Sequence, residues 1–192
     1  MTPITPERPP TKAQIARLAR YERIIDAARD IAEADGWAAV TVRRLADAIG
    51  YSQPVLYGHF PDGRDGIVRA VAMDGFTRLA DTLTASEPSP AAVVDGYLAF
   101  AAAHPATYDA MFSMPTDIVF ASDDTPEALR VSFARLSAVV AGTGDPETNA
   151  ELLWIALHGL VELQRHGRLR PAYAQERRDR LVAMFTNHGD HR

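Results

Sequence analysis

Residues 41–60 read TVRRLADAIGYSQPVLYGHF, and this stretch decides the fold of the first part of the chain. Its first half carries apolar side chains at helical spacing, which predicts a short helix over residues 41–49. The inner face of that helix is expected to contain Val42, Leu45, Ala46 and Ile49. Gly50 follows, and glycine permits the tight turn that would end the helix.

The second half of the stretch predicts another short helix, over residues 52–59. Ser52 can cap its start, and Val55 or Leu56 would face the core. Two short helices joined by a tight turn make a helix-turn-helix, whose second helix can place its N-terminal residues in the major groove of DNA. The same spacing occurs in any helical hairpin, so a purely structural hairpin stays open at this point.

The rest of the chain also predicts helices. Its thirteen prolines stand where helical periods of apolar residues begin or end, and no segment requires a strand. Nine helices are expected, at about residues 11–34, 41–49, 52–59, through Val68 to near Ser86, 90–104, 105–112, 125–141, 146–166 and 173–187. The predicted fold class is all-α. The expected organisation is a disordered, Pro-rich tail over residues 1–10, a helix-turn-helix domain over 11–66 and a helical bundle over 67–192.

Capping residues mark several of these helix ends. Thr11 and Gln14 have the spacing of a capping box, and Gly36 would end the same helix. Its apolar stripe is expected to be Leu18, Tyr21, Ile25, Ala28 and Ala32. Later starts are marked by a capping side chain before a proline, at Ser89-Pro90, Thr125-Pro126-Glu127 and Asp145-Pro146-Glu147.

The charge of the chain is unevenly distributed. The net charge of −5 alone would argue against a polyanionic partner. Residues 1–70 carry ten Lys/Arg against nine Asp/Glu, whereas residues 71–150 carry three against eleven. Residues 8–23 have an excess of four positive charges, so the acidic total hides a basic N-terminal face. Such a face is either an ordinary solvated helix surface or a contact for nucleic acid.

Several classes of site and location are excluded or disfavoured by composition. The chain has no cysteine, which excludes disulfides, thiolate zinc sites and iron–sulfur clusters, and no cofactor is expected. His158, Glu162 and His166 have a helical spacing that could gather metal ligands, but two helical turns separate the end residues, so we predict no metal site. No apolar run is long enough for a membrane span, and a cytoplasmic location is expected.

Several motifs resemble the TetR family of bacterial transcriptional regulators. They are Arg23-Ile24-Ile25-Asp26-Ala27-Ala28, Gly36, Thr41-Val42, Leu45-Ala46, Ile49-Gly50-Tyr51-Ser52 and Leu56-Tyr57-Gly58-His59-Phe60. The likeness covers about residues 14–70, and the chain length and nine helices also fit. Trp154-Ile155-Ala156-Leu157-His158-Gly159-Leu160 resembles the Trp-His-Gly subgroup of the family, over about residues 90–185.

The resemblance implies a regulator that binds double-stranded operator DNA as a homodimer, on a near-palindromic site. Residues 41–49 and 52–59 would be its DNA-reading unit. At the start of the second helix, Gln53 could pair with a base edge and Pro54 or Val55 could contact a thymine methyl. The expected base-reading residues are Ser52, Gln53, Pro54 and Val55, and the expected phosphate-contacting residues are Thr41, Arg43, Arg44, Tyr57 and His59.

The chain departs from the family at one position. The family usually has a lysine three residues after the phenylalanine of the His-Phe pair, where this chain has Gly63. The sequence fits the pattern if one residue has been inserted, which would make Arg64 the phosphate-binding cation and Asp65 the following acid. Arg64 is therefore predicted to contact DNA.

The second domain would bind an effector, by the same resemblance. In the family a ligand between its helices shifts the helix joined to the DNA-binding unit, so that the two recognition helices no longer match the operator. The expected ligand-binding residues are Phe76, Tyr97, Phe100, His104, Tyr108, Met111, Phe112, Phe133 and His158. An apolar lining with few polar groups suits a small, mostly hydrophobic effector, although most of these side chains could equally be core.

The last two helices are expected to form the dimer interface. They hold more apolar surface than two terminal helices can hide in one subunit. The expected interface residues are Leu153, Leu157, Leu160, Val161, Leu163, Leu181, Val182 and Phe185.

The leading interpretation is thus a ligand-responsive repressor. One alternative is a DNA-binding regulator whose second domain only dimerises or binds a protein partner. A second alternative is an all-α enzyme, but no nucleophile elbow or phosphate loop occurs, and the pair His104 and Tyr108 is a weak candidate for acid–base catalysis. We therefore predict that the protein is not an enzyme.

Overall fold

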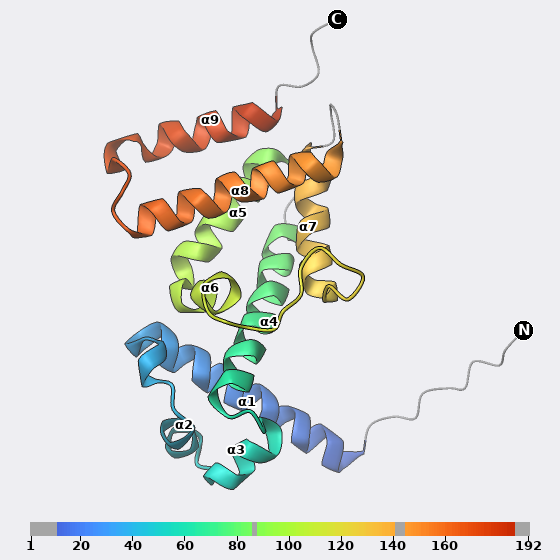
Figure 1. Cartoon of the computed structure of the whole chain (residues 1–192), viewed down its shortest axis with the longest axis vertical. Coiled ribbons are helices and arrows are strands. Elements are labelled where there is room, and N and C mark those ends of the chain that lie inside the picture. The colour runs from blue at the N-terminus through green and yellow to red at the C-terminus, as the bar shows by residue number, and fades with distance from the viewer. Residues whose placement is uncertain (1–10, 86–87, 141–144, 187–192) are drawn as a thin grey trace, which may run out of the picture. The chain divides into compact units, whose positions relative to one another are not determined.

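A computed structural model gives the structure of residues 11–85, 88–140 and 145–186. Nine α-helices and two short 3-10 helices, and no strand, occur among these described residues (Figure 1). The helices are α1 Lys12–Asp35, η1 Trp37–Ala39, α2 Val42–Ile49, α3 Gln53–His59, α4 Arg64–Thr84, α5 Pro90–Ala103, α6 Pro105–Phe112, α7 Glu127–Val140, α8 Pro146–Arg165, η2 Pro171–Tyr173 and α9 Ala174–Thr186. The all-α prediction is confirmed for this part of the chain.

The chain divides into two compact units between Val71 and Ala72, a point that lies within α4. The domain boundary expected from the sequence, after residue 66, lies nearer the start of the same helix. The tail predicted over residues 1–10 lies outside the described residues, as do the expected helix ends near residues 86, 141 and 187.

The first helix begins as its capping residues predict. Thr11 Oγ1 accepts a hydrogen bond from the Gln14 amide at 3.2 Å, and Gln14 Oε1 accepts one from the Thr11 amide at 2.7 Å. The expected apolar stripe is wrong at its N-terminal end, where Leu18 is 57% exposed. Residues 11–19 are all exposed and burial begins only further along α1, at Ile24, so the described residues of this unit do not cover the first turns of the helix.

The helix-turn-helix follows α1. Gly50 ends α2 with a left-handed φ of +71°, which is the turn that the sequence predicts. Leu45 and Leu56, one from each helix, are buried in the core of this unit. Helix α1 supports the turn, because the Arg23 guanidinium donates to the Tyr51 hydroxyl at 3.2 Å and to the Ile49 carbonyl at 3.4 Å.

Helix α5 is central to the second unit, where it packs against α7, α8 and α9 (Figure 1). The described core includes Tyr97 of α5, Tyr108 of α6 and Leu153 and Leu157 of α8. Helices α4 and α6 approach closely at Gly75, because a Cβ there would lie 2.7 Å from the Met111 sulfur and from Thr107 Cγ2. Glycine at this position allows Met111 to be buried against the helix backbone.

Two of the three proline-linked caps are confirmed. Ser89 Oγ accepts from the Ala92 amide at 3.1 Å, and Asp145 Oδ2 accepts from the Thr148 amide at 3.0 Å. The prediction for Thr125 is wrong, because its hydroxyl accepts from the Ser122 amide within the preceding loop and α7 begins at Glu127. A side chain that can accept a hydrogen bond within a local turn is then not available to cap the following helix.

No helix in the described ranges combines the length and the hydropathy that a membrane span requires.

Candidate DNA-binding and ligand-binding sites

The start of α3 presents three small or polar side chains to solvent. Ser52, Gln53 and Pro54 are all exposed, Val55 is half-buried, and Leu56 anchors the helix in the core. Ser52 occupies the N-cap position, but its side chain makes no capping hydrogen bond, contrary to the expectation from the sequence. The exposed N-terminal turn of a short helix is the part of a helix-turn-helix that can enter a groove.

The residues expected to contact phosphates have different surroundings. Arg43 is exposed, with its nearest carboxylate, that of Asp47, 4.0 Å away. Arg44 forms an ion pair with Asp35 of α1, and its backbone amide is capped by Thr41 Oγ1 at 3.1 Å. Of the two guanidinium groups, only that of Arg43 has no close ion pair to give up before it binds a phosphate.

Tyr57 and His59 lie at the other end of α3. Tyr57 is 49% exposed. The His59 ring lies 6.5 Å from the Tyr21 ring, and partial burial, with the nearby Arg17 and Arg20, lowers the pKa of His59 below its usual value. A neutral imidazole still has one N–H to donate to a phosphate.

Arg64 makes contacts that sequence reasoning missed. Its guanidinium Nε donates to the Val40 carbonyl at 3.2 Å, and its Nη2 donates to the Trp37 carbonyl at 3.0 Å. These bonds tie the start of α4 to the segment between α1 and α2. Arg64 therefore links α4 to the segment that leads into the helix-turn-helix, and a contact with DNA would be an additional role.

The second unit contains a cavity of about 550 Å³. Its apolar wall comes from α4, α5, α6, α7, α8 and the loop before α7. Four of the predicted ligand-binding residues line it, namely Phe76, Tyr97, Phe112 and Phe133. Phe112 meets Phe76 edge-on with ring centroids 5.3 Å apart, so the aromatic side chains form a continuous wall.

The other five predicted ligand-binding residues are not in the cavity lining. Phe100 and His104 contact each other with ring centroids 5.2 Å apart, and Met111 is buried against Gly75. Tyr108 and His158 lie behind Tyr97, in a hydrogen-bonded chain. Because these five side chains do not line the cavity, the structure does not support their direct contact with a ligand there.

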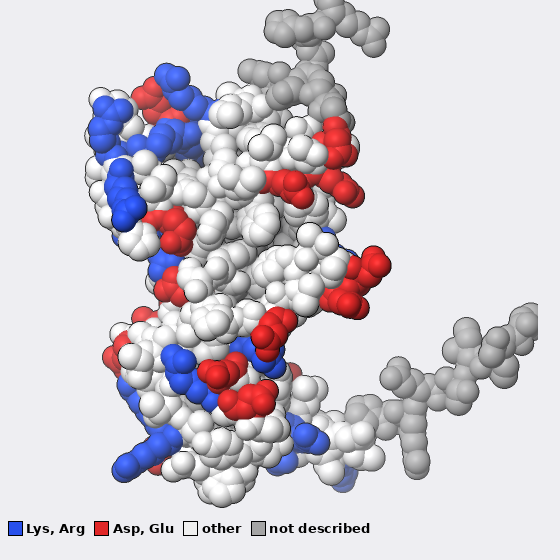
Figure 2. Space-filling model, in the orientation of Figure 1, with Lys and Arg blue, Asp and Glu red and all other residues white. Residues whose placement is uncertain are grey.

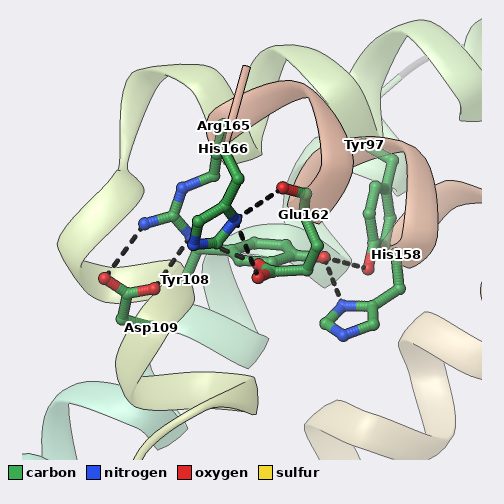
Figure 3. A network of polar contacts seen from close by, with 7 residues as sticks. All are labelled: Tyr97, Tyr108, Asp109, His158, Glu162, Arg165 and His166. Atoms are coloured by element: carbon green, nitrogen blue, oxygen red, sulfur yellow. Dashed lines mark hydrogen bonds and ion pairs between the residues drawn. The ribbon is translucent and has the colours of Figure 1, made fainter. Parts of the chain in front are cut away.

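That chain is drawn in Figure 3. The Tyr97 and Tyr108 hydroxyls are 3.0 Å apart, and the Tyr108 hydroxyl lies 2.8 Å from His158 Nδ1. Burial raises the pKa of Tyr97 to about 12 and raises that of Tyr108 as well. Both phenols therefore stay protonated at neutral pH and act as hydrogen-bond groups.

A second cluster lies beside the chain in Figure 3. Arg165 of α8 donates to both carboxylate oxygens of Asp109 of α6, at 2.8 and 3.0 Å. Glu162 lies next to Arg165, and His166 Nδ1 lies 2.7 Å from the Glu162 carbonyl oxygen. His158 thus contacts Tyr108, whereas His166 contacts Glu162, and no group of metal-ligating side chains occurs among the described residues.

Sequence reasoning missed several residues of the cavity wall. Phe120 and Trp154 stack with ring centroids 6.1 Å apart, and both line the cavity. The remaining polar lining residues are Ser122, Asp123, Thr125, Arg130, Ser132, Glu147 and Glu151. Trp154 belongs to the Trp-His-Gly motif, which could have indicated its importance. Phe120 lies in a loop without helical periodicity, so the sequence does not predict its position in the cavity wall.

Four of the eight expected dimer residues are buried within one subunit, whereas Leu163 is 42% exposed. Leu153, Leu157, Val161 and Leu181 are at most 8% exposed, so this part of the prediction is wrong. They form the face of α8, and the contact point of α9, that packs on the unit's own core. Leu160, Val182 and Phe185 are half-buried.

A different face of α8 is exposed. Leu152 and Ile155 are 52% and 64% exposed, and Met184 of α9 is 63% exposed. Leu152, Met184 and Phe185 line a groove of about 280 Å³. An uncovered apolar face of this kind is typical of a protein–protein contact.

Comparison with known proteins decides the family. The family model described as bacterial regulatory proteins of the tetR family matches residues 24–71, and the model described as a tetracyclin repressor-like C-terminal domain matches residues 91–186. An uncharacterised HTH-type transcriptional regulator of Mycobacterium tuberculosis, Rv0681, is 31% identical over an alignment of 168 residues that covers 81% of this chain and 74% of the relative. The chain belongs to the TetR family.

Solved structures share the fold. A protein from Rhodococcus sp. RHA1 superposes with a TM-score of 0.70 at 25% identity, covering 86% of this chain and 93% of that one. SmeT, solved in a complex with triclosan, superposes with a TM-score of 0.54 at 18% identity, covering 86% and 91%. The TetR family consists of transcription regulators, so this protein is a DNA-binding transcriptional regulator with a helix-turn-helix and not an enzyme.

Proposed function

We propose that this TetR-family protein is a repressor that binds a near-palindromic operator as a homodimer and is released by a small, mostly hydrophobic effector. The cavity in the second unit is the observation that carries the ligand response. Its volume, about 550 Å³, and its aromatic wall fit a small molecule. SmeT, a structural neighbour, was solved with triclosan, which supports a ligand role for a domain of this fold.

The DNA contact is assigned to α3 and the residues around it. Gln53 is the proposed base-reading residue, because its exposed amide can pair with an adenine edge. Ser52, Pro54 and Val55 would complete the base contacts. Thr41, Arg43, Arg44, Tyr57, His59 and Arg64 would hold phosphates. Since transcription in bacteria takes place in the cytoplasm, we place the protein there.

The dimer contact is assigned to the exposed faces of α8 and α9. Leu152, Ile155 and Met184 supply uncovered apolar surface, and the half-buried Leu160, Val182 and Phe185 border on it. Two copies of this surface would cover each other around a two-fold axis. A two-fold protein matches a palindromic site.

A band-shift titration tests this proposal. The purified protein is titrated against the DNA upstream of its own reading frame, over a range of salt concentrations and with a panel of small aromatic molecules. We expect retardation that weakens steeply with salt, and release by at least one molecule of the panel. If the DNA is not retarded, the proposal that the protein binds an operator in this region is contradicted. If the DNA is retarded but no molecule releases it, the alternative is favoured in which the second unit only dimerises or binds a protein partner.

A further inference from the structure

The polar groups of the cavity wall are hydroxyls, carboxylates and one guanidinium, that of Arg130. Tyr97 and Ser132 supply the two buried hydroxyls, and Ser122 and Thr125 of the loop before α7 supply two more. The carboxylates are those of Asp123, Glu147 and Glu151. The direction of each hydroxyl proton decides whether the group offers a ligand a donor or an acceptor.

Tyr97 is 1% exposed, and its hydroxyl lies 3.0 Å from the Tyr108 hydroxyl. If Tyr108 donates to His158 Nδ1, Tyr97 donates to Tyr108 and every proton of the chain has an acceptor (Figure 3). In the reverse order, the Tyr97 proton is left over and can be given to an acceptor in the cavity that Tyr97 lines. The first order leaves an oxygen lone pair of Tyr97 for a ligand.

Ser132 is in the same situation. Its hydroxyl donates to the Ala128 carbonyl at 3.0 Å, one turn back in α7, with the Phe76 carbonyl 3.5 Å away. The single proton is used by backbone carbonyls, and Ser132 is 8% exposed. What it offers to the cavity is again an oxygen lone pair.

The mouth of the cavity is acidic. Asp123, Glu147 and Glu151 are exposed, and none of them has an ion-pair partner among the residues that the structure describes. Arg130 is the cation of the lining, and Glu127 already pairs with it at 2.5 Å. Figure 2 shows the matching acidic edge of this unit, over the start of α8 and the loop before α7.

The aromatic wall adds to this preference. Phe76, Phe112, Phe120 and Trp154 line the cavity, and the face of an aromatic ring attracts cations. Buried oxygen acceptors, exposed carboxylates and aromatic rings all favour a cationic ligand with N–H donors.

We propose that the effector cavity selects a planar aromatic molecule that carries a positive charge and N–H donors. This inference rests on the proposed role of the cavity as the effector site. The aromatic body would lie among the phenylalanines and Trp154. Its N–H groups would donate to Tyr97 or Ser132, and its charge would be balanced by Glu147 and Glu151.

Three probes with the same ring system separate this class from its alternatives. They are 9-aminoacridine, which is a cation with N–H donors at neutral pH, uncharged acridine, and acridine-9-carboxylate, which is an anion. Isothermal titration calorimetry on the full chain at pH 7.5 should show 9-aminoacridine binding about tenfold more tightly than acridine, and the carboxylate more weakly than either. One added hydrogen bond and one exposed charge contact account for a difference of this size. The gap should narrow as salt is raised.

Variants locate the binding. The double variant Glu147→Gln/Glu151→Gln should weaken 9-aminoacridine about three- to tenfold and leave acridine unchanged. Tyr97→Phe should weaken 9-aminoacridine about two- to tenfold, again without an effect on acridine. Glu22→Gln is the matched control, because it removes one exposed carboxylate from α1 of the other unit and should change neither affinity.

The outcomes separate the inference from the function on which it rests. Equal or tighter binding of acridine or its carboxylate would overturn the inference and leave a ligand-binding cavity in place. Binding of none of the three would also overturn it. Neither result touches DNA binding, which the band shift measures by itself.

Discussion

Gly63 has a backbone φ of +59°, and a Cβ built on it would lie 3.3 Å from the Tyr57 ring. This explains why the chain has glycine where the family usually has lysine. A left-handed backbone costs a side-chain-bearing residue about 1–2 kcal/mol. The turn after Phe60 needs a glycine, and the cation follows one position later.

Gly63→Ala should lower the free energy of unfolding by about 1–2 kcal/mol, measured by urea denaturation. Gly58→Ala is the matched control, since Gly58 lies inside α3 with open space around it. Alanine there should leave the stability unchanged or raise it, because it favours a helix. Equal effects of the two variants would contradict the turn described here.

Tyr97 makes the stability of the protein sensitive to alkali. Its pKa is about 12 in the folded protein and about 10 in the unfolded chain, so folding favours the protonated phenol. The resulting stability is fully present below pH 10 and is lost as the pH rises through 12. We expect the free energy of unfolding to fall by about 2–3 kcal/mol across this window, and by less in Tyr97→Phe, measured by urea denaturation at each pH. If the free energy of unfolding falls equally in the wild type and in Tyr97→Phe, ionisation of Tyr97 is not the cause of the loss of stability.

The sequence predicted a helix start correctly where the capping side chain had no competing hydrogen-bond partner among the described residues. Thr11 and Asp145 cap α1 and α8 as the sequence predicts, because each is followed by residues that already favour a helix. Thr125 closes a loop instead, and Ser52 stands at the N-cap of α3 without a capping bond. The sequence pattern identified both positions but not the partner that the side chain would take.

The start of α4 shows the same limit. Arg64 was identified as a cation at a helix N-terminus, but its bonds to the Trp37 and Val40 carbonyls join residues 24 or more apart. Such a contact depends on how α1, α2 and α4 pack together, and it cannot be predicted from the spacing of residues along the chain.

Arg64→Ala should therefore lower the free energy of unfolding by about 1–3 kcal/mol, since part-buried hydrogen bonds from a charged group are lost. Arg64→Lys is the matched variant, because it keeps the charge but lacks the planar fork. If Arg64 also holds a phosphate, the alanine variant should lower operator affinity and reduce the salt slope by about one, and the lysine variant should retain the slope. Unchanged affinity and slope in Arg64→Ala would show that the one-residue insertion is the wrong alignment.

For the whole molecule, the sequence predicted the class of the fold and the helix-turn-helix, but four of the residues that it assigned to the dimer contact are buried in the core of one subunit. Leu153 and Leu157 are as apolar as Leu152 and Ile155, and composition does not tell them apart. Only the packing of α8 against the core shows that the first pair is buried and the second pair exposed. The family resemblance assigned ligand binding to four residues that line the cavity, but it did not include Phe120, which a loop supplies.

Ile155→Arg should dissociate the dimer, because it places a charge at the centre of an apolar contact. Sedimentation equilibrium at micromolar concentration should give a dimer for the wild type and a monomer for this variant. Val119→Arg is the control, since Val119 is also exposed and apolar but lies in the loop before α7. A monomeric wild type would remove the two-fold operator from the proposal.

Footprinting on the DNA upstream of the reading frame is the most direct test of whether a dimer reads its operator with α3. We expect protection of two half-sites about one helical turn apart. Gln53→Ala should raise the protein concentration needed for protection about fivefold or more, because one good base contact contributes about 1–3 kcal/mol. Arg43→Ala should weaken binding to all sequences alike and reduce its salt dependence. A single unpaired protected site, or a Gln53→Ala footprint identical to that of the wild type, would contradict a dimer that reads its operator with α3.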